Sequence, residues 1–155
     1  MKTQIIDLRG ILYRDISRMI KTKSNSETEV LILIGHGTLD GTQLMGLSAS
    51  DILELIRPKL IMFYACNCGK SMVRQIAKSG LMSFGFITNI MIGNNDKTIE
   101  IAFKVLSNVK NDAQYSEIMD QLRDAWFENA IEFLGKGCFL DAAILNHCRL
   151  SIRYG

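Results

Sequence analysis

The stretch Val30-Leu31-Ile32-Leu33-Ile34, followed at once by Gly35-His36-Gly37, decides the fold expected for this 155-residue chain. Five consecutive β-branched and aliphatic residues are typical of a strand that is covered on both faces, as strands of parallel sheets are. A second run of this kind, Leu60-Ile-Met-Phe-Tyr-Ala65, ends at Cys66-Asn67-Cys68-Gly69. The two runs predict buried strands, each of which leads into a loop with reactive side chains.

The spacing of apolar residues along the rest of the chain predicts alternating strands and helices. Strands are expected at residues 3–8 and 84–92, and the tail from 139 to 154 fits a helical turn followed by a last strand. Helices are expected at residues 11–23, 51–56, 72–80, 99–109 and 115–133. Ser48 and Asp51 have the spacing of a capping box at the start of the second of these helices. This alternation predicts an α/β fold, in which a mostly parallel sheet carries helices on both faces.

The composition favours one ordinary globular domain over residues 1–155. Hydrophobic residues make up 48% and charged residues 22% of the chain, far from the composition of disordered proteins. Pro58 is the single proline, and no Gly/Ser tract, charge run or repeat marks a domain boundary. The net charge of +2 is too small to create the basic field that binds phosphate backbones, so we expect no nucleic-acid partner.

The distribution of apolar residues also argues against a membrane protein. The longest apolar runs are much shorter than the roughly 18–20 residues that span a bilayer. Asp7 and Arg9 interrupt what would be the apolar part of a secretory signal. We therefore expect no membrane association and a cytoplasmic location, where cysteines stay mostly as thiols. The cysteines are Cys66, Cys68, Cys138 and Cys148.

His36 and Cys66 directly follow the two buried strands, and they are the first candidates for chemistry. Loops converge at the carboxyl ends of parallel strands, and sequential strands are neighbours about two-thirds of the time. Neighbouring strands would bring the two side chains together as a nucleophilic pair. An imidazolium, or the N-terminus of a helix beginning near Gly69, would stabilise the thiolate. The imidazole would later protonate a leaving amine.

The glycines beside His36 suit the same chemistry. Attack on a carbonyl creates an oxyanion that needs amide donors, and the backbone N–H groups of Gly37 and Cys66 are the candidates. Gly35 and Gly37 would also allow unusual backbone angles around the histidine.

These motifs resemble the caspase-like cysteine peptidases, and they are most similar to the CHAT-type branch. The similarity lies in Leu31 to Gly37, Asp40-Gly41, Leu44, Leu47 to Ile52 and Leu60 to Gly69, and it extends over roughly residues 28 to 133. It implies a caspase-hemoglobinase-like three-layer sandwich and hydrolysis of peptide bonds through a thioester, with no cofactor or metal. In that reaction His36 matches the catalytic histidine and Cys66 the nucleophile.

The resemblance also implies partners. The substrate would be a protein or peptide, and Asp40 is a candidate acidic contact for it. The chain is short for the family, so a regulatory protein partner or larger complex would complete the cleft or activate the enzyme. A non-catalytic or partner-dependent interaction module with the same fold is the alternative.

Two other kinds of site are weaker. A zinc site would use Cys66, Cys68, His147 and Cys148, but this spacing differs from the usual pairs separated by two to four residues. We expect His147, Cys148 and Cys138 to be structural residues.

A nucleotide-binding turn is the other weak alternative. Gly35-x-Gly37-x-x-x-Gly41 departs from the dinucleotide fingerprint by one residue and lacks the Lys-Ser/Thr pair of a P-loop.

Overall fold

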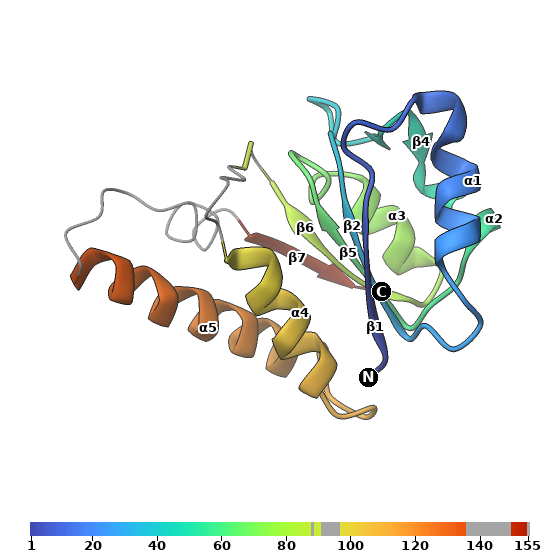
Figure 1. Cartoon of the computed structure of the whole chain (residues 1–155). Helices are drawn as coiled ribbons and strands as arrows, with labels where there is room; N and C mark the ends of the chain where they lie inside the picture. Colours follow the sequence, from blue (N-terminus) through green and yellow to red (C-terminus); the bar gives the residue numbers. More distant parts are fainter. Residues whose placement is uncertain (88, 91–96, 136–149, 155) are drawn as a thin grey trace.

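A computed structural model describes residues 1–87, 89–90, 97–135 and 150–154 of the chain (Figure 1). Among these residues the main element is a five-stranded sheet in the order β1-β2-β5-β6-β7. Its strands are β1 (Thr3–Asp7), β2 (Val30–Ile34), β5 (Leu60–Tyr64), β6 (Met82–Phe86) and β7 (Leu150–Tyr154). The first four strands are parallel, and β7 runs antiparallel to β6.

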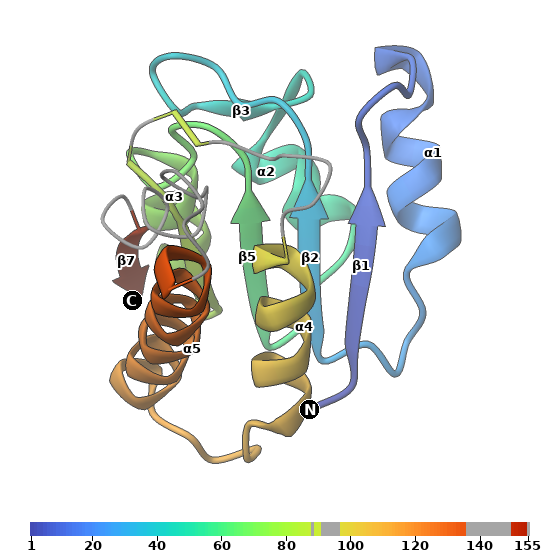
Figure 2. The same ribbon diagram turned by 60° about the vertical axis from the view of Figure 1, so that its left-hand side comes forward.

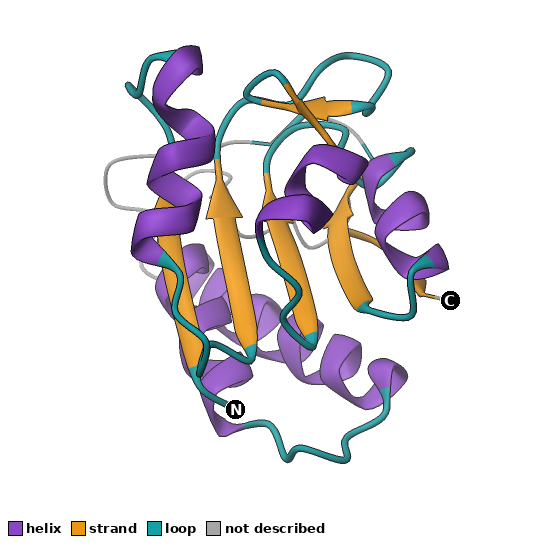
Figure 3. Cartoon of the chain, turned by 90° about the vertical axis from the view of Figure 1, so that its right-hand side faces the viewer, coloured by secondary structure: helices purple, strands orange, loops and turns teal. Residues whose placement is uncertain are grey.

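Helices cover both faces of the sheet. One face carries α1 (Tyr13–Lys23), α2 (Ala49–Leu55) and α3 (Met72–Lys78), whereas α4 (Thr98–Asn108) and α5 (Tyr115–Gly135) cover the other (Figure 2 and Figure 3). The four parallel strands follow one another in chain order, so right-handed crossovers place all three connecting helices on the same face. The expected α/β class, with helices on both faces of a mostly parallel sheet, is confirmed.

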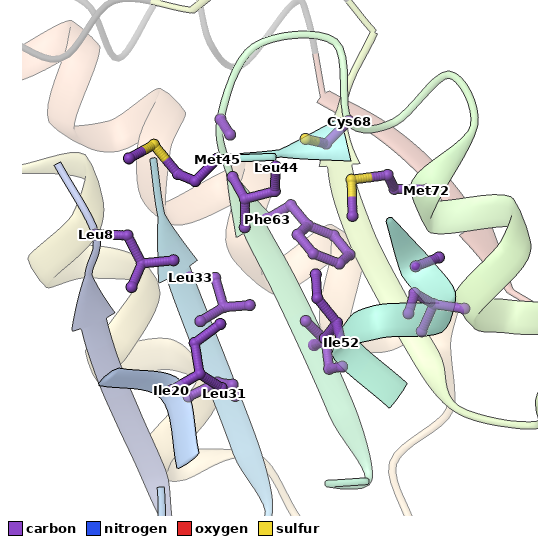
Figure 4. Close-up of a cluster of buried hydrophobic side chains, with 14 of the residues drawn as sticks. Leu8, Ile20, Leu31, Leu33, Leu44, Met45, Ile52, Phe63, Cys68 and Met72 are labelled. Atoms are coloured by element: carbon purple, nitrogen blue, oxygen red, sulfur yellow. The ribbon is translucent and has the colours of Figure 1, made fainter. Parts of the chain in front are cut away.

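The side chains of β2 and β5 alternate between two apolar cores, which explains their unbroken apolar sequences. Every residue of both strands is buried. The core under α1, α2 and α3, part of which Figure 4 shows, takes Leu31, Leu33, Ile61 and Phe63. The core under α4 and α5 takes Val30, Ile32, Ile34, Leu60, Met62 and Tyr64. Burial on both faces therefore explains why β2 and β5 consist of consecutive apolar residues.

Two features differ from the expected elements. The fourth parallel strand, β6, spans Met82–Phe86 and begins two residues earlier than expected, because it aligns with β5 from Met82 opposite Leu60 onward. Residues 88, 91 and 92 of the expected strand lie outside the described residues. A small hairpin, β3 (Gln43–Leu44) and β4 (Leu47–Ser48), occupies a segment expected to be a loop. None of the helices in the described part of the chain is long and apolar enough to cross a membrane.

The capping box at α2 is present as expected. The Ser48 hydroxyl accepts a hydrogen bond from the Asp51 N–H, and the Asp51 carboxylate accepts one from the Ser48 N–H. These bonds satisfy two amides that the first turn of a helix leaves without partners.

We expect Ser48→Ala to lower the free energy of unfolding by about 1 kcal/mol, because an N-cap hydroxyl is lost. Urea denaturation followed by circular dichroism measures the change. Ser50→Ala is the matched control, since Ser50 is exposed in the same first turn and caps no amide. Equal stability of the two variants would contradict the role of the cap.

Candidate active site

The register of β2 and β5 places His36 and Cys66 at equivalent positions. Ile34 pairs with Tyr64 at the carboxyl ends of these neighbouring parallel strands, and each candidate lies two residues further on. Adjacent strands are separated by about 4.8 Å, so the two residues leave the same edge of the sheet side by side. His36 is exposed and Cys66 is half-buried. The structure therefore brings together the two residues singled out from the sequence.

The loops that carry His36 and Cys66 are in direct backbone contact at Gly37. A Cβ atom built on Gly37 would lie 1.9 Å from the carbonyl oxygen of Cys66 and 3.0 Å from the Cys68 sulfur. Only a residue without a side chain fits there. Neither Gly35 nor Gly37 has a positive φ, so the expectation of unusual backbone angles is wrong and close packing is the reason for both glycines.

The surroundings of the Cys66 sulfur differ from the expected helix N-terminus. The first helical residue of α3 is Met72, and residues 66–71 form turns. The Gly69 N–H donates to the Phe86 carbonyl, and the Met72 N–H donates to the Gly41 carbonyl. These amides are therefore committed elsewhere, and the expectation that a helix N-terminus stabilises the thiolate is not met.

The main-chain amide of Ile90 is the group that contacts this sulfur. It donates to Cys66 Sγ at 3.3 Å, and the Ile90 carbonyl lies 3.9 Å from the same sulfur. Beside this contact, the Asn67 Nδ2 donates to the Asn89 Oδ1 at 3.0 Å. The segment after β6 is thus held against the loop that follows β5.

The two amides proposed for an oxyanion lie in the loops that follow β2 and β5. In the described residues, neither the Gly37 N–H nor the Cys66 N–H donates a backbone hydrogen bond. Flanking bonds explain this at Gly37, because the Thr38 N–H donates to the Gln43 carbonyl and the His36 carbonyl accepts from the Met45 N–H. Gly37 itself faces Leu44 at a non-bonded position of this ladder.

Asp40 lies in the loop that follows His36, and its carboxylate organises that loop. The Asp40 Oδ1 accepts hydrogen bonds from the hydroxyls of Thr38 and Thr42, both at 2.8 Å, and from the Thr42 N–H. The Thr38 hydroxyl is the largest of the influences that lower the pKa of Asp40 below its usual value. Asp40 is therefore an exposed anion at the edge of the site.

Asn67 is a site residue that the sequence analysis missed. Its side chain is buried, and its φ of 60° lies in the left-handed region. Asparagine enters this region more readily than most residues, so an Asn directly after the strand and Cys66 was an available signal. This sharp turn lets the chain leave β5 immediately after Cys66.

Cys68 is buried in the core under α1, α2 and α3, and its sulfur packs beneath Gly37 (Figure 4). Burial, with a smaller contribution from Cys66, raises the pKa of the Cys68 thiol to about 12. Both described cysteines are free thiols. The described residues contain no cluster of three metal-ligand side chains, whereas His147, Cys148 and Cys138 lie outside them.

The nucleotide-binding alternative finds no support in the loop after β2. Gly41 has a φ of 73°, and a Cβ atom there would lie 2.2 Å from the Asn67 carbonyl oxygen. The chain then enters the short strand β3, so no helix begins where a phosphate would have to be held.

Comparisons with protein families, with characterised proteins and with solved structures find no match for this chain. Its function is therefore inferred from the geometry of this site.

We expect Gly37→Ala to separate the two loops, because the new methyl group would overlap the Cys66 carbonyl. Overpacking of this kind costs about 1–3 kcal/mol. Any dependence of Cys66 alkylation on His36 should disappear, so that Gly37→Ala and Gly37→Ala/His36→Ala react at equal rates. Gly10→Ala is the control, because Gly10 has a φ of 78° but nothing within 4 Å of a new Cβ. A His36-dependent rate that persists in Gly37→Ala would contradict the contact.

We expect iodoacetamide at pH 8 to modify Cys66 in the folded protein and to leave Cys68 intact. A thiol whose pKa is about 12 is ionised at pH 8 to only about one part in ten thousand, and the thiolate is the reactive form. Mass spectrometry of proteolytic peptides locates the label. In urea both cysteines should react at similar rates, and labelling of native Cys68 as fast as Cys66 would refute its burial.

Proposed function

We propose that this protein is a cysteine peptidase in which Cys66 is the nucleophile and His36 the general acid and base. The observation that carries the proposal is the contact of Gly37 with the Cys66 carbonyl at the shared edge of β2 and β5. A cysteine peptidase needs a thiol, an imidazole and amide donors within the span of one peptide group. The contact joins the backbones of the two loops that carry these components, which supports the proposal.

The proposed reaction has two stages. The thiolate of Cys66 forms a bond to the carbonyl carbon of a peptide, and the carbon–nitrogen bond breaks as the His36 imidazolium gives its proton to the leaving amine. The product of this stage is a thioester. His36 then removes a proton from water, whose oxygen attacks the thioester carbonyl. The acid product leaves, and the proton on His36 accompanies the released Cys66 sulfur as an ion pair or thiol.

The N–H groups of Gly37 and Cys66 would bind the oxyanion in both stages. Both donors are free of other backbone hydrogen bonds in the described residues, which supports this role. Preorganised donors of this type commonly contribute about 3–4 kcal/mol to transition-state stabilisation.

The proposed substrate is a protein or peptide that crosses the exposed edge of the sheet. His36 and the loop of Asp40 lie on this edge and are open to solvent. Asp40 remains a candidate contact for a basic substrate side chain, since its Oδ2 is outside the hydrogen bonds that organise the loop.

A non-catalytic interaction module is the second candidate. Large apolar side chains are exposed beside the site, with Leu39 exposed to 78% and Tyr13 to 63%. Leu39 follows β2, and the Tyr13 ring lies 3.0 Å from a Cβ built on Gly46 in the β3–β4 turn. Exposed apolar residues of this kind could contact a regulatory partner as well as a substrate. The interaction module therefore differs from the peptidase only in the absence of turnover.

The test is cleavage of a peptide library by the wild type, Cys66→Ala and His36→Ala, with and without material that co-purifies with the protein. We expect the wild type to cleave a subset of peptides. Each substitution should lower kcat/KM at least about a hundredfold, because it removes the nucleophile or the proton carrier. Circular dichroism confirms that both variants are folded.

Two outcomes would count against the peptidase. Turnover that survives in Cys66→Ala would assign cleavage to a contaminant. No turnover by the wild type under any condition, together with equal binding of a co-purifying partner by the wild type and Cys66→Ala, would favour the interaction module.

A further inference from the structure

We infer that Asp7 is a positioning residue for His36, so that three neighbouring strands each contribute one member of the reactive set. The inference rests on the proposed function, which it deepens. It assigns Asp7 no contact with the substrate. Asp7 would act only through the orientation and charge of the imidazole.

The position of Asp7 follows from the pairing of β1 with β2. Asp7 lies opposite Ile34, and the Leu8 N–H donates to the Ile34 carbonyl at 2.8 Å, so the pairing continues to the end of β1. His36 follows two residues after Ile34, just beyond the end of β2. A rise of about 3.3 Å per residue and a strand spacing of about 4.8 Å separate the Cα atoms of Asp7 and His36 by roughly 8 Å. Aspartate and histidine side chains on one face can meet across this distance.

The two side chains share a face of the sheet. Ile6 and Leu8 are buried in the core under α1, α2 and α3, so Asp7 between them lies on the opposite face. Ile34 packs into the core under α4 and α5, on that same opposite face. After the end of β2, a Cβ atom on Gly35 would face Leu44 and Met45 of the core under α1, α2 and α3, so alternation of an extended chain returns His36 to the face of Ile34 and Asp7.

Arg9 holds the Asp7 carboxylate in place. The Arg9 Nε donates to Oδ1 at 3.0 Å and Nη2 donates to Oδ2 at 2.7 Å, while the Arg9 N–H also reaches Oδ1. Oδ2 thus accepts one of these three bonds and keeps a lone pair for an imidazole N–H. Pairing with Arg9 fixes one carboxylate orientation, which a positioning residue requires.

The charges agree with this arrangement. The pKa of Asp7 is lowered chiefly by the hydrogen bond from Arg9, against partial burial that raises it, and the positive charge of His36 lowers it further. Asp7 is therefore an anion at neutral pH. Because its side chain is 44% exposed, solvent weakens the interaction without removing it.

The function of this carboxylate would be to keep the imidazole in one tautomer and orientation. The ring nitrogen that faces Asp7 would carry the proton, and the other nitrogen would face Cys66. Asp7, His36 and Cys66 leave β1, β2 and β5, which are consecutive strands of the sheet. This order supplies carboxylate, imidazole and sulfur in the sequence that such a relay of hydrogen bonds needs.

The first test measures the coupling and needs no catalytic activity. Carbon-13 NMR follows the titration of the Asp7 carboxyl in the wild type and in His36→Ala. We expect the pKa of Asp7 to rise in His36→Ala, because a positive charge that lowers it is lost. An unchanged titration of Asp7 would overturn the inference.

The second test compares Asp7→Asn with a matched control, Asp15→Asn. Asp15 also pairs with an arginine, Arg18, but it lies on α1, on the far side of the sheet from the Asp7 face. We expect Asp7→Asn to lower kcat about 10- to 100-fold with KM nearly unchanged, because a misplaced catalytic group costs about this factor. Asp7→Glu should recover part of the loss, and Asp15→Asn should resemble the wild type.

Alkylation of Cys66 gives a parallel readout for Asp7→Asn that does not depend on a peptide substrate. We expect a lower rate than in Asp15→Asn. If Asp7→Asn and Asp15→Asn have the same kcat and the same alkylation rate, the inference is overturned. An increase in KM alone would also overturn it, because Asp7 would then be a substrate contact.

The two proposals fail separately. One outcome is that the wild type shows no turnover, while Asp7 is coupled to His36 and Asp7→Asn is alkylated more slowly. This outcome would overturn the proposed peptidase activity and support the role of Asp7. Turnover that Asp7→Asn leaves unchanged would overturn only the role of Asp7.

Discussion

The parallel pairing of β2 with β5, with Ile34 opposite Tyr64, is the constraint on which the whole site depends. A slip of one residue would turn every side chain of one strand to the other face. Cys66 would then lie on the same face as Leu31 and Leu33, and it would no longer lie beside His36. Full burial of both strands on two faces makes such a slip very costly. The geometry of a polar, exposed site is thus specified by apolar residues beneath it.

The carboxyl end of β5 is also held by contacts on the face of the sheet that α4 and α5 cover. The Tyr64 hydroxyl forms a hydrogen bond with the Thr98 hydroxyl at the start of α4, and the Trp126 Nε1 of α5 donates to the Thr98 carbonyl at 3.0 Å. The Tyr64 ring also meets the Phe86 ring edge to face, at 5.3 Å between centroids. Tyr64, at the centre of these contacts, is two residues before Cys66 in the chain. It links the end of β5 to both helices of that layer.

The features that the sequence predicts well are those with a local physical cause. The bounds of β2 follow from five buried positions in a row, and the start of α2 follows from the reciprocal bonds of Ser48 and Asp51. The neighbouring positions of His36 and Cys66 were also predictable, because sequential strands of an α/β sheet usually pair.

The remaining features depend on contacts between distant segments. The limits of β6 are set by its alignment with β5, whose partner residues the sequence pattern does not identify. Met45 and Gly46 adopt φ angles of 49° and 83° in the two-residue turn of the hairpin, and although glycine is common at the second position, a methionine at the first gives no sign of such a turn. The contact of Ile90 with the Cys66 sulfur uses main-chain atoms, so it has no signature in side-chain chemistry.

The glycines at 37 and 41 have a consequence for how such a protein could diversify. A Cβ atom at either position would overlap a main-chain carbonyl of the turn at Cys66 and Asn67, so these two glycines allow the close approach of the two loops. Leu39 and Asp40, between the two glycines, are exposed. Mutations of the Leu39 side chain could therefore alter molecular recognition while the glycine contacts keep the two loops together, whereas Asp40 also organises the loop through Thr38 and Thr42. Position 39 is thus the natural place to begin engineering selectivity.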